Sequence, residues 1–335
     1  MIISRTPFRI SFFGGGTDYP QWFQKHKGAV VATTIDKYCY ISCRYLPPFF
    51  RHRSRIIYSK MEHVQTLAEI QHPAVREVLK FLNIRQGVEI HHDGDLPART
   101  GLGSSSSFTV GLLNSMYALI GKMPTKEQLA REAIYIEQKR CKENVGCQDQ
   151  TLASYGGFNF IEFGGDVHLR TQKITMPQGR VKRLQEHLML YFTGLSRHAS
   201  KIAAQQVRNI AHRERELRTM YQMALEALEI LNRDDLLAFG RLLSENWMLK
   251  KSLSHKISTP SIDAIYDTAR RSGALGGKLL GAGGGGFVLL FVPLERQNKV
   301  KEKLKNLLLI PFKFEDLGTQ IIFYHPNYGH LEEES

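Results

Sequence analysis

A glycine- and serine-rich segment at residues 97–107 has the composition of a phosphate-binding loop. Its glycines let the backbone approach a ligand closely. Its serines fall at the start of a predicted apolar helix, where free backbone N–H groups and the helix dipole attract anions. The segment lacks the lysine of the GxxxxGK[ST] pattern, and a flexible loop that caps the helix is the alternative interpretation. The residues predicted to face phosphate are Gly101, Leu102, Gly103, Ser104, Ser105, Ser106 and Ser107.

A second glycine-rich segment, at residues 281–286, lies between two apolar runs. Five of its six residues are glycine, which is more than a tight two-residue turn requires. We therefore expect this loop to approach either a second ligand or the first glycine loop closely. A loose hairpin is the alternative.

Two acidic residues, Glu137 and Asp149, lie 12 positions apart on either side of a turn. A carboxylate beside a transferred phosphoryl group can orient or deprotonate an acceptor hydroxyl. A second carboxylate can hold the Mg²⁺ that accompanies nucleotide phosphates. The alternative is a solvated glutamate and an ordinary turn aspartate.

Arg9 and Asp18 flank a glycine turn at residues 14–16. An aspartate in such a place can accept hydrogen bonds from sugar hydroxyls. An arginine can stabilise negative charge or lower the pKa of a neighbouring carboxyl group. The alternative is an arginine at the end of a strand and an aspartate that caps a helix.

The chain has 335 residues and a formal net charge of +13. Such a charge makes nucleic acid a class of partner to consider. The basic residues are dispersed, however, and the densest group, at residues 51–55, has no interleaved aromatic side chains for base stacking. An anionic small substrate accounts for the charge equally well, and we expect neither a nucleic-acid nor a membrane partner.

Features of the chain's start and its cysteines favour a cytoplasmic protein. No apolar run approaches the roughly 18 residues that cross a bilayer, and residues 1–5 do not resemble a secretory signal. The four cysteines form no CxxC pair, so we expect neither a disulfide framework nor a structural metal.

The pattern of strands and helices predicts an α+β fold in two domains, at residues 1–175 and 176–335. Thr125 and Thr259 are predicted helix N-caps, since each precedes a helical pattern. Residues 201–231 contain neither glycine nor proline and are predicted to form one long helix, with a kink as the alternative.

Taken together, the segments resemble the GHMP kinase superfamily, named for galacto-, homoserine, mevalonate and phosphomevalonate kinases. The three motifs of that superfamily occur in its order, at residues 7–18, 97–107 and 281–286. Residues 146–150 add a fourth point of similarity. The resemblance implies an N-terminal domain like ribosomal protein S5, a ferredoxin-like C-terminal domain, and ATP and acceptor bound between them.

The resemblance also implies roles for individual residues. Asp149 corresponds to the catalytic aspartate, and Arg9 lies beside it in such kinases. Ser105 and Glu137 are implied to hold Mg²⁺, and the loop at residues 101–107 to wrap the phosphates of ATP. The implied substrate-binding residues are Gly15, Gly16, Thr17, Asp18, Gly283 and Gly284.

Departures within the first motif indicate the class of acceptor. Galactokinases carry Glu-His where this chain has Gly15 and Gly16, so the side chains expected to recognise galactose are missing. The Gly-Gly-Gly-Thr-Asp form is similar to that of D-glycero-D-manno-heptose 7-phosphate kinases, as are residues 193–197 and 276–286. That resemblance implies phosphorylation of an anomeric hydroxyl, giving a heptose 1,7-bisphosphate for lipopolysaccharide, capsule or S-layer glycan precursors.

An anionic acceptor agrees with the basic charge of the chain. Arg197, at the start of a predicted helix, is the candidate that binds the acceptor's phosphate, with a solvated surface arginine as the alternative. Lys251 and Lys278 are further candidates. Another sugar-1-kinase, fucokinase-like or galactokinase-like, and a non-catalytic sensor of sugar and ATP remain alternative functions.

Overall fold

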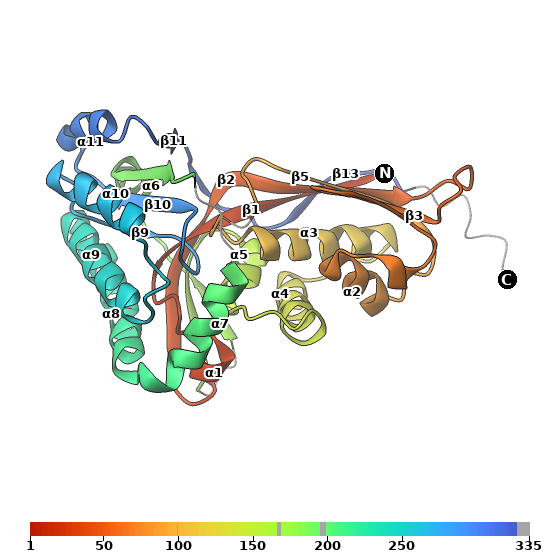
Figure 1. Ribbon diagram of the computed structural model, residues 1–335, viewed down its shortest axis with the longest axis horizontal. Helices are drawn as coiled ribbons and strands as arrows, with labels where there is room; N and C mark the ends of the chain where they lie inside the picture. The colour runs from red at the N-terminus through yellow and green to blue at the C-terminus, as the bar shows by residue number, and fades with distance from the viewer. Residues whose placement is uncertain (99, 166–168, 195–198, 327–335) are drawn as a thin grey trace.

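Two β-sheets organise the chain, the larger running to the right and the smaller lying to the left in Figure 1. The computed structural model describes residues 1–98, 100–165, 169–194 and 199–326. No helix within these ranges combines the length and the apolar composition that a bilayer span requires.

The larger sheet has nine strands, and all but one of its strand pairs are antiparallel. Its strands are β1 (Ile2–Phe13), β2 (Gly28–Tyr45), β3 (Ser54–Ile57), β4 (Met61–Val64), β5 (Val88–Gly94), β6 (Phe158–Phe163), β7 (Leu169–Lys173), β12 (Phe314–Glu315) and β13 (Gln320–Tyr324). The 18-residue strand β2 pairs with β1 on one side and with β5, β6 and β12 at different points along its length. Its first eight residues are buried, which explains their unbroken apolar and threonine-rich composition.

Helices cover one face of this sheet, below it in Figure 1. They are α2 (Pro73–Phe81), α3 (Ser104–Leu119), α4 (Lys126–Tyr135), the π-helix η2 (Ile136–Arg140) and α5 (Gln148–Tyr155). Helix α3 is buried almost all round because it packs between the sheet and the other helices. Ser4 of β1 donates a hydrogen bond to the Gly111 carbonyl of α3 at 3.0 Å, so small side chains bring this helix close to the strand.

The smaller sheet has four antiparallel strands in the order β11-β8-β10-β9. They are β8 (Leu188–Phe192), β9 (Gly276–Leu279), β10 (Phe287–Phe291) and β11 (Leu308–Ile310). The helices of this half are α6 (Gln178–Glu186), α7 (Ala199–Asn209), α8 (Glu214–Arg233), α9 (Leu236–Ser252), α10 (Pro260–Arg271) and α11 (Gln297–Lys303). Short helical turns complete the chain: α1 (Pro20–Phe23), η1 (Leu67–Glu69), η3 (Ile210–His212) and η4 (Leu294–Arg296).

The end of the chain returns to the larger sheet. Strand β13 pairs with β1, and β12 pairs with β2. The predicted division at residue 175 falls between β7 of the larger sheet and α6, but the range 176–335 is not a single structural unit. The reason is that the edge of β1 is covered by a strand from the far end of the chain, a long-range pairing that local patterns do not reveal.

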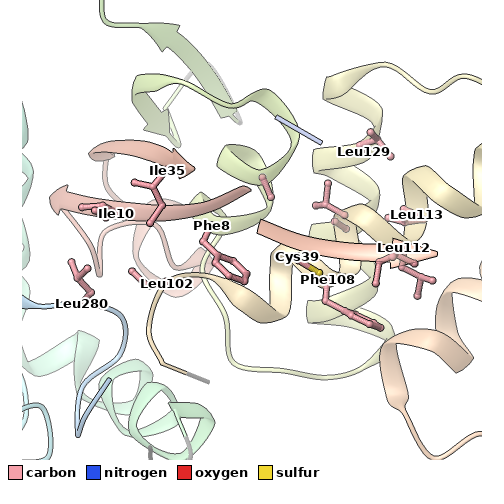
Figure 2. Packing of buried hydrophobic residues seen from close by; sticks show 14 of the residues in the cluster. Phe8, Ile10, Ile35, Cys39, Leu102, Phe108, Leu112, Leu113, Leu129 and Leu280 are labelled. Atoms are coloured by element: carbon pink, nitrogen blue, oxygen red, sulfur yellow. The ribbon is translucent and has the colours of Figure 1, made fainter. Parts of the chain in front are cut away.

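One hydrophobic core joins the two halves. The same cluster of buried side chains contains Ile10 and Leu102 from the first half and Leu280 from the second. Figure 2 shows Leu280 on the side of this cluster where Leu102 and Ile10 lie. Because the halves share buried apolar contacts, the residues between them are held in a defined geometry.

The local predictions for the helices have mixed outcomes. Thr125 and Thr259 each accept a hydrogen bond from the backbone three residues later and are N-caps, as predicted. The long helix predicted at residues 201–231 is instead α7 and α8, separated by a turn at Ile210–His212. Asn209 fixes this turn by donating its side-chain N–H to the Leu253 carbonyl oxygen at 3.0 Å.

The return of the chain end can be tested at Gly156. This residue has φ +69°, and a Cβ atom there would lie 2.1 Å from the Leu317 carbonyl carbon and from the Gly318 nitrogen. Gly156→Ala therefore combines backbone strain with a clash against the returning segment. We expect a loss of about 2 kcal/mol or more, seen by calorimetry as a fall of several degrees in Tm. The control is Gly179→Ala in α6, where a Cβ meets nothing within 4 Å; equal shifts in both variants would contradict the described packing.

Candidate active site

A bidentate ion pair between Arg9 and Asp149 lies at the centre of the candidate site. Arg9 Nε and Nη2 donate to the two carboxylate oxygens of Asp149, each at 2.7 Å. Arg9 comes from β1 and Asp149 from the first turn of α5. The Arg9 side chain is 6% exposed and that of Asp149 is 25% exposed, so an incoming molecule reaches the carboxylate and not the guanidinium. The predicted pairing of these two residues is present in the structure.

The first glycine loop packs directly on this ion pair. Arg9 Nη1 donates to the Gly101 carbonyl oxygen at 2.7 Å. Gly103 has φ +76°, and a Cβ atom there would lie 3.1 Å from Arg9 Cγ and 3.4 Å from Asp149 Oδ2. Only glycine combines this backbone conformation with so close an approach. Gly103 is also the N-cap of α3, so the free N–H groups of this helix start beside the catalytic candidates.

The second glycine loop packs on the first. A Cβ atom on Gly281 would lie 2.4 Å from Gly101 Cα, and one on Gly286 would lie 2.0 Å from the Thr100 carbonyl oxygen. The expected close approach of the two loops is therefore confirmed. Gly284 N donates to the Ile257 carbonyl oxygen at 2.9 Å, and Gly283 faces Ile257 as well. The role of Gly283 and Gly284 in binding substrate stays a prediction.

Asp18 lies in a buried polar group beside the ion pair. Its Oδ1 accepts from Gly16 N at 2.9 Å and its Oδ2 from Gln148 Nε2 at 3.0 Å. Burial is the main reason why the pKa of Asp18 is raised, and the charge of Asp149 acts in the same direction. Because α5 carries both Gln148 and Asp149, it positions Asp18 and the catalytic candidate together.

Polar atoms near Gly15 lack partners within the part of the chain that the structure describes. They are Ser11 Oγ and Gln148 Oε1, both buried. A Cβ atom on Gly15 would lie 3.5 Å from Ser11 Oγ and 3.7 Å from Gln148 Nε2. A hydroxyl-bearing ligand beside Gly15 would supply hydrogen bonds to such atoms. The sequence analysis did not identify Ser11 or Gln148 as site residues, although they lie in the motifs at residues 7–18 and 146–150.

The Thr17 side chain has a structural role in the glycine turn, and its predicted contact with substrate stays a prediction. Thr17 is fully buried, and its hydroxyl donates to the carbonyl oxygens of Gly14 and Ala29 and accepts from Ala29 N. Its hydrogen-bonding capacity is thus used to close the glycine turn. Thr17 holds the loop that carries Gly15, Gly16 and Asp18.

Glu137 is a buried carboxylate in the π-helix η2 and is 1% exposed. It accepts hydrogen bonds from Ser106 Oγ at 2.9 Å, from Thr109 Oγ1 at 2.8 Å and from Gln150 Nε2. No ion pair to Glu137 is found within the described ranges. Burial raises the pKa of Glu137 to about 7.

The surroundings of Glu137 fit a Mg²⁺ ion. A carboxylate without a cationic partner and nearby hydroxyl oxygens are the hard oxygen donors that this ion prefers, and nucleotide phosphates usually complete its ligands. No group of three or more His, Cys, Asp or Glu side chains suited to a metal occurs in the described residues, so the protein alone would supply few ligands. Ser106 and Thr109 contact Glu137 through their hydroxyl groups, whereas the predicted ligand Ser105 is exposed.

Two buried lysines complete the charges around the site. Lys250 of α9 donates to the Gly281 carbonyl oxygen at 2.6 Å, and Lys278 of β9 donates to the Phe12 carbonyl oxygen at 2.7 Å. Burial lowers the pKa of Lys250 to about 8 and lowers that of Lys278 well below its usual range. Lys251 instead forms an ion pair with Asp263 at 3.0 Å.

Sequence reasoning missed Lys250, and one predicted residue is not placed. Lys250 follows Leu243 and Trp247 on the buried face of α9, and a lysine at that spacing is the signal that could have identified it. Arg197, the candidate for the acceptor's phosphate, lies outside the described residues.

Family models match both halves of the chain. The model described as GHMP kinases N terminal domain matches residues 67–157, and the model described as GHMP kinases C terminal matches residues 224–308. The first range contains the loop at the start of α3, Glu137 and Asp149. The second contains Lys250 and the second glycine loop.

Curated proteins with similar sequences are kinases. The chain is 29% identical to a D-glycero-alpha-D-manno-heptose 7-phosphate kinase from Campylobacter jejuni, over 91% of this chain and 94% of that protein. It is 29% identical to a mevalonate kinase from Methanocaldococcus jannaschii, over 70% of each chain. It is 27% identical to an L-fucokinase/L-fucose-1-P guanylyltransferase from Bacteroides fragilis, over 87% of this chain and 34% of that protein.

Solved structures share the fold. A D-glycero-D-manno-heptose 1-phosphate kinase from Bacteroides thetaiotaomicron has a TM-score of 0.78 at 24% identity, with 97% of this chain and 100% of that chain covered. A galactokinase from Lactococcus lactis complexed with galactose has a TM-score of 0.72 at 16% identity, with 95% and 94% covered. The predicted α+β fold class and its two-domain architecture are thereby confirmed.

The buried charge of Glu137 predicts a specific dependence of stability on pH. A glutamate in an unfolded chain has a pKa of about 4.3, whereas burial raises the pKa of Glu137 to about 7. Between these values the folded state binds more protons than the unfolded state, so the free energy of unfolding falls as pH rises. Glu137→Gln removes this loss, and its stability relative to the unmodified protein rises on the order of 2–3 kcal/mol from pH 4.5 to pH 7.5.

The measurement is Tm as a function of pH without added metal or nucleotide. The matched control is Glu127→Gln, because Glu127 is exposed on α4. A difference between Glu137→Gln and the unmodified protein that stays constant over this pH range would contradict the raised pKa.

Proposed function

We propose, from the premise that the chain belongs to the GHMP kinase superfamily and is a phosphotransferase, that it transfers the γ-phosphoryl group of ATP to the anomeric hydroxyl of a sugar phosphate. The acceptor proposed is D-glycero-D-manno-heptose 7-phosphate, and the product is the 1,7-bisphosphate. The observation that carries the proposal is the Arg9–Asp149 ion pair, directly contacted by the glycine loop at the start of α3. We place the reaction in the cytoplasm.

Asp149 binds the acceptor hydroxyl in this proposal. Its carboxylate is held in one orientation by two hydrogen bonds from Arg9 and keeps 25% of its side chain exposed. The acceptor oxygen forms a bond to the γ-phosphorus as the bond from that phosphorus to the leaving oxygen of ADP breaks. Asp149 accepts the hydroxyl proton or orients it toward the phosphate, and a loose transition state makes this positioning the main contribution.

The start of α3 and Glu137 are assigned to the nucleotide. Backbone N–H groups of residues 101–107 bind phosphate oxygens at the positive end of the helix dipole. Glu137, together with Ser105 as predicted from the family or Ser106 as its hydrogen-bond partner, would hold Mg²⁺. When bound, that ion would neutralise phosphate charge.

The proposed identity of the acceptor rests on the similar proteins and on the glycine turn at residues 14–16. The curated relative from Campylobacter jejuni is named a heptose 7-phosphate kinase, while the similar structure from Bacteroides thetaiotaomicron is titled a heptose 1-phosphate kinase. We favour the 7-phosphate because an anomeric hydroxyl must be free to accept a phosphoryl group. The 27% identity to a fucokinase supports fucose as the second candidate. Asp18, Gly15 and Gly16 are the residues proposed to contact the sugar.

The test is ADP release with Mg·ATP and a panel of heptose 7-phosphate, mannose, fucose and galactose. We expect turnover with heptose 7-phosphate to exceed that with the other sugars by at least about tenfold in kcat/KM. Asp149→Asn serves as the catalytic control and lowers kcat by at least about 10²-fold, in line with general-base contributions.

Preference for an unphosphorylated sugar would contradict the proposed acceptor but not the kinase activity. Near-normal turnover of Asp149→Asn would contradict the role of Asp149. Nucleotide binding without turnover on any sugar would favour a sensor.

A further inference from the structure

Lys250 is a buried cation that the proposed mechanism does not use. It lies on the face of α9 that packs into the protein and is 6% exposed. Its Nζ donates a hydrogen bond to the Gly281 carbonyl oxygen at 2.6 Å. A lysine that only fills space on such a face is unexpected, because a buried charge costs free energy unless it is paired.

The hydrogen-bonding capacity of Lys250 is only partly used. An ammonium group has three N–H donors, and the Gly281 carbonyl oxygen takes one of them. No ion pair of Lys250 and no second acceptor for its Nζ are found within the residues that the structure covers. The remaining donors are available to an anionic ligand, which would also compensate the buried charge.

A chain of contacts connects Lys250 to the candidate catalytic residues Arg9 and Asp149. Gly281, which holds its Nζ, is packed on Gly101, and the Gly101 carbonyl oxygen accepts from Arg9. Arg9 lowers the pKa of Lys250 further after burial, while Asp18 and Asp149 raise it. The contacts through Gly281 and Gly101 therefore link Lys250 to the Arg9–Asp149 pair.

The position distinguishes between two possible anions. The 7-phosphate of the proposed acceptor is separated from the reacting anomeric hydroxyl by the length of the sugar chain. Lys250 instead contacts Gly281, which packs on Gly101 beside the Arg9–Asp149 pair, where the hydroxyl reacts. The anion that would lie near both Asp149 and the start of α3 is the phosphoryl group that is being transferred.

We propose that Lys250 is a catalytic residue that donates hydrogen bonds to oxygens of the transferred phosphoryl group. This inference rests on the proposed function, since it assumes that Asp149 receives the acceptor. Lys250 comes from the C-terminal half and Asp149 from the N-terminal half, so the reacting group is contacted from both. A preorganised cation of this kind stabilises charge in the transition state and typically contributes 10²–10³-fold to kcat.

The first test measures nucleotide affinity and needs no sugar. Titration calorimetry compares Mg·ADP with a magnesium complex of a non-hydrolysable ATP analogue, in the full-length protein and in Lys250→Met. We expect the variant to bind the ATP analogue at least about tenfold more weakly and ADP within about twofold of the unmodified protein. Lys251→Met is the matched control, because Lys251 is the next residue of α9 and pairs with Asp263; it leaves both affinities unchanged.

Equal weakening of both nucleotides, or no weakening, would overturn the proposal. The Tm of Lys250→Met separates function from folding. Since the substitution removes a buried charge, we expect Tm to remain at least as high as that of the unmodified protein. If the variant fails to fold, Lys250→Arg is used in its place. It keeps the charge with a different donor geometry, and it is expected to retain the preference for the ATP analogue over ADP.

The second test measures the pH dependence of kcat/KM with the best acceptor. Lys250 is cationic below its pKa of about 8 and neutral above it, so kcat/KM falls as pH rises through about 8. The charged groups that affect this pKa are Arg9 of β1, Asp18 after β1 and Asp149 of α5, and Lys278 of β9 interacts with Lys250 as well. The decline is absent in Lys250→Arg, which stays protonated.

An unchanged decline in Lys250→Arg would assign it to another group and overturn this part of the inference. If no sugar of the panel is phosphorylated, the proposed acceptor fails. The nucleotide measurement still decides the role of Lys250, so the two failures are distinguishable.

Discussion

The bidentate ion pair between Arg9 and Asp149 is the interaction on which the rest of the site depends. It joins the long strand β1 to the first turn of α5, and Arg9 uses its remaining Nη1 donor to hold the Gly101 carbonyl oxygen. The two glycine loops then pack against this pair and against each other, at distances that leave no room for a Cβ atom. A buried guanidinium with several acceptors fixes geometry better than a flexible point charge would. The loops and the carboxylate are thus positioned by one side chain.

The site also concentrates buried charges that the protein alone does not neutralise. Glu137 has hydrogen bonds but no cationic partner within the described part of the chain, and Lys250 has one carbonyl acceptor and no anionic partner there. Burial raises the pKa of Glu137 and lowers that of Lys250, so that it favours the neutral form of each. Bound Mg²⁺ and nucleotide phosphates would compensate both charges. The cation would lie near Glu137 and the phosphoryl group near Lys250. Perturbed groups of this kind cluster at functional sites.

Much of this arrangement could be predicted from the sequence because glycine carries a direct geometric meaning. The close approach of the loops at residues 101–107 and 281–286 follows from their glycines, whereas the Arg9–Asp149 pair was implied by the resemblance to GHMP kinases. Other features could not be predicted, because they depend on long-range packing. The pairing of β13 with β1, the burial of Thr17 and the inward position of Lys250 arise from contacts between segments far apart in the chain. Which serine of the run faces Glu137 depends on the rotation of the helix, and a run of four serines does not specify it.

The most direct test of the central claim is a double-mutant cycle on kcat/KM with Arg9→Met, Asp149→Asn and the variant that combines them. Residues that act as one unit give strongly non-additive losses. If Arg9 acts by holding Asp149 in place, the double variant is within about tenfold of the more impaired single variant. If the two losses multiply instead, Arg9 and Asp149 act independently, and the ion pair is not the element on which the site depends.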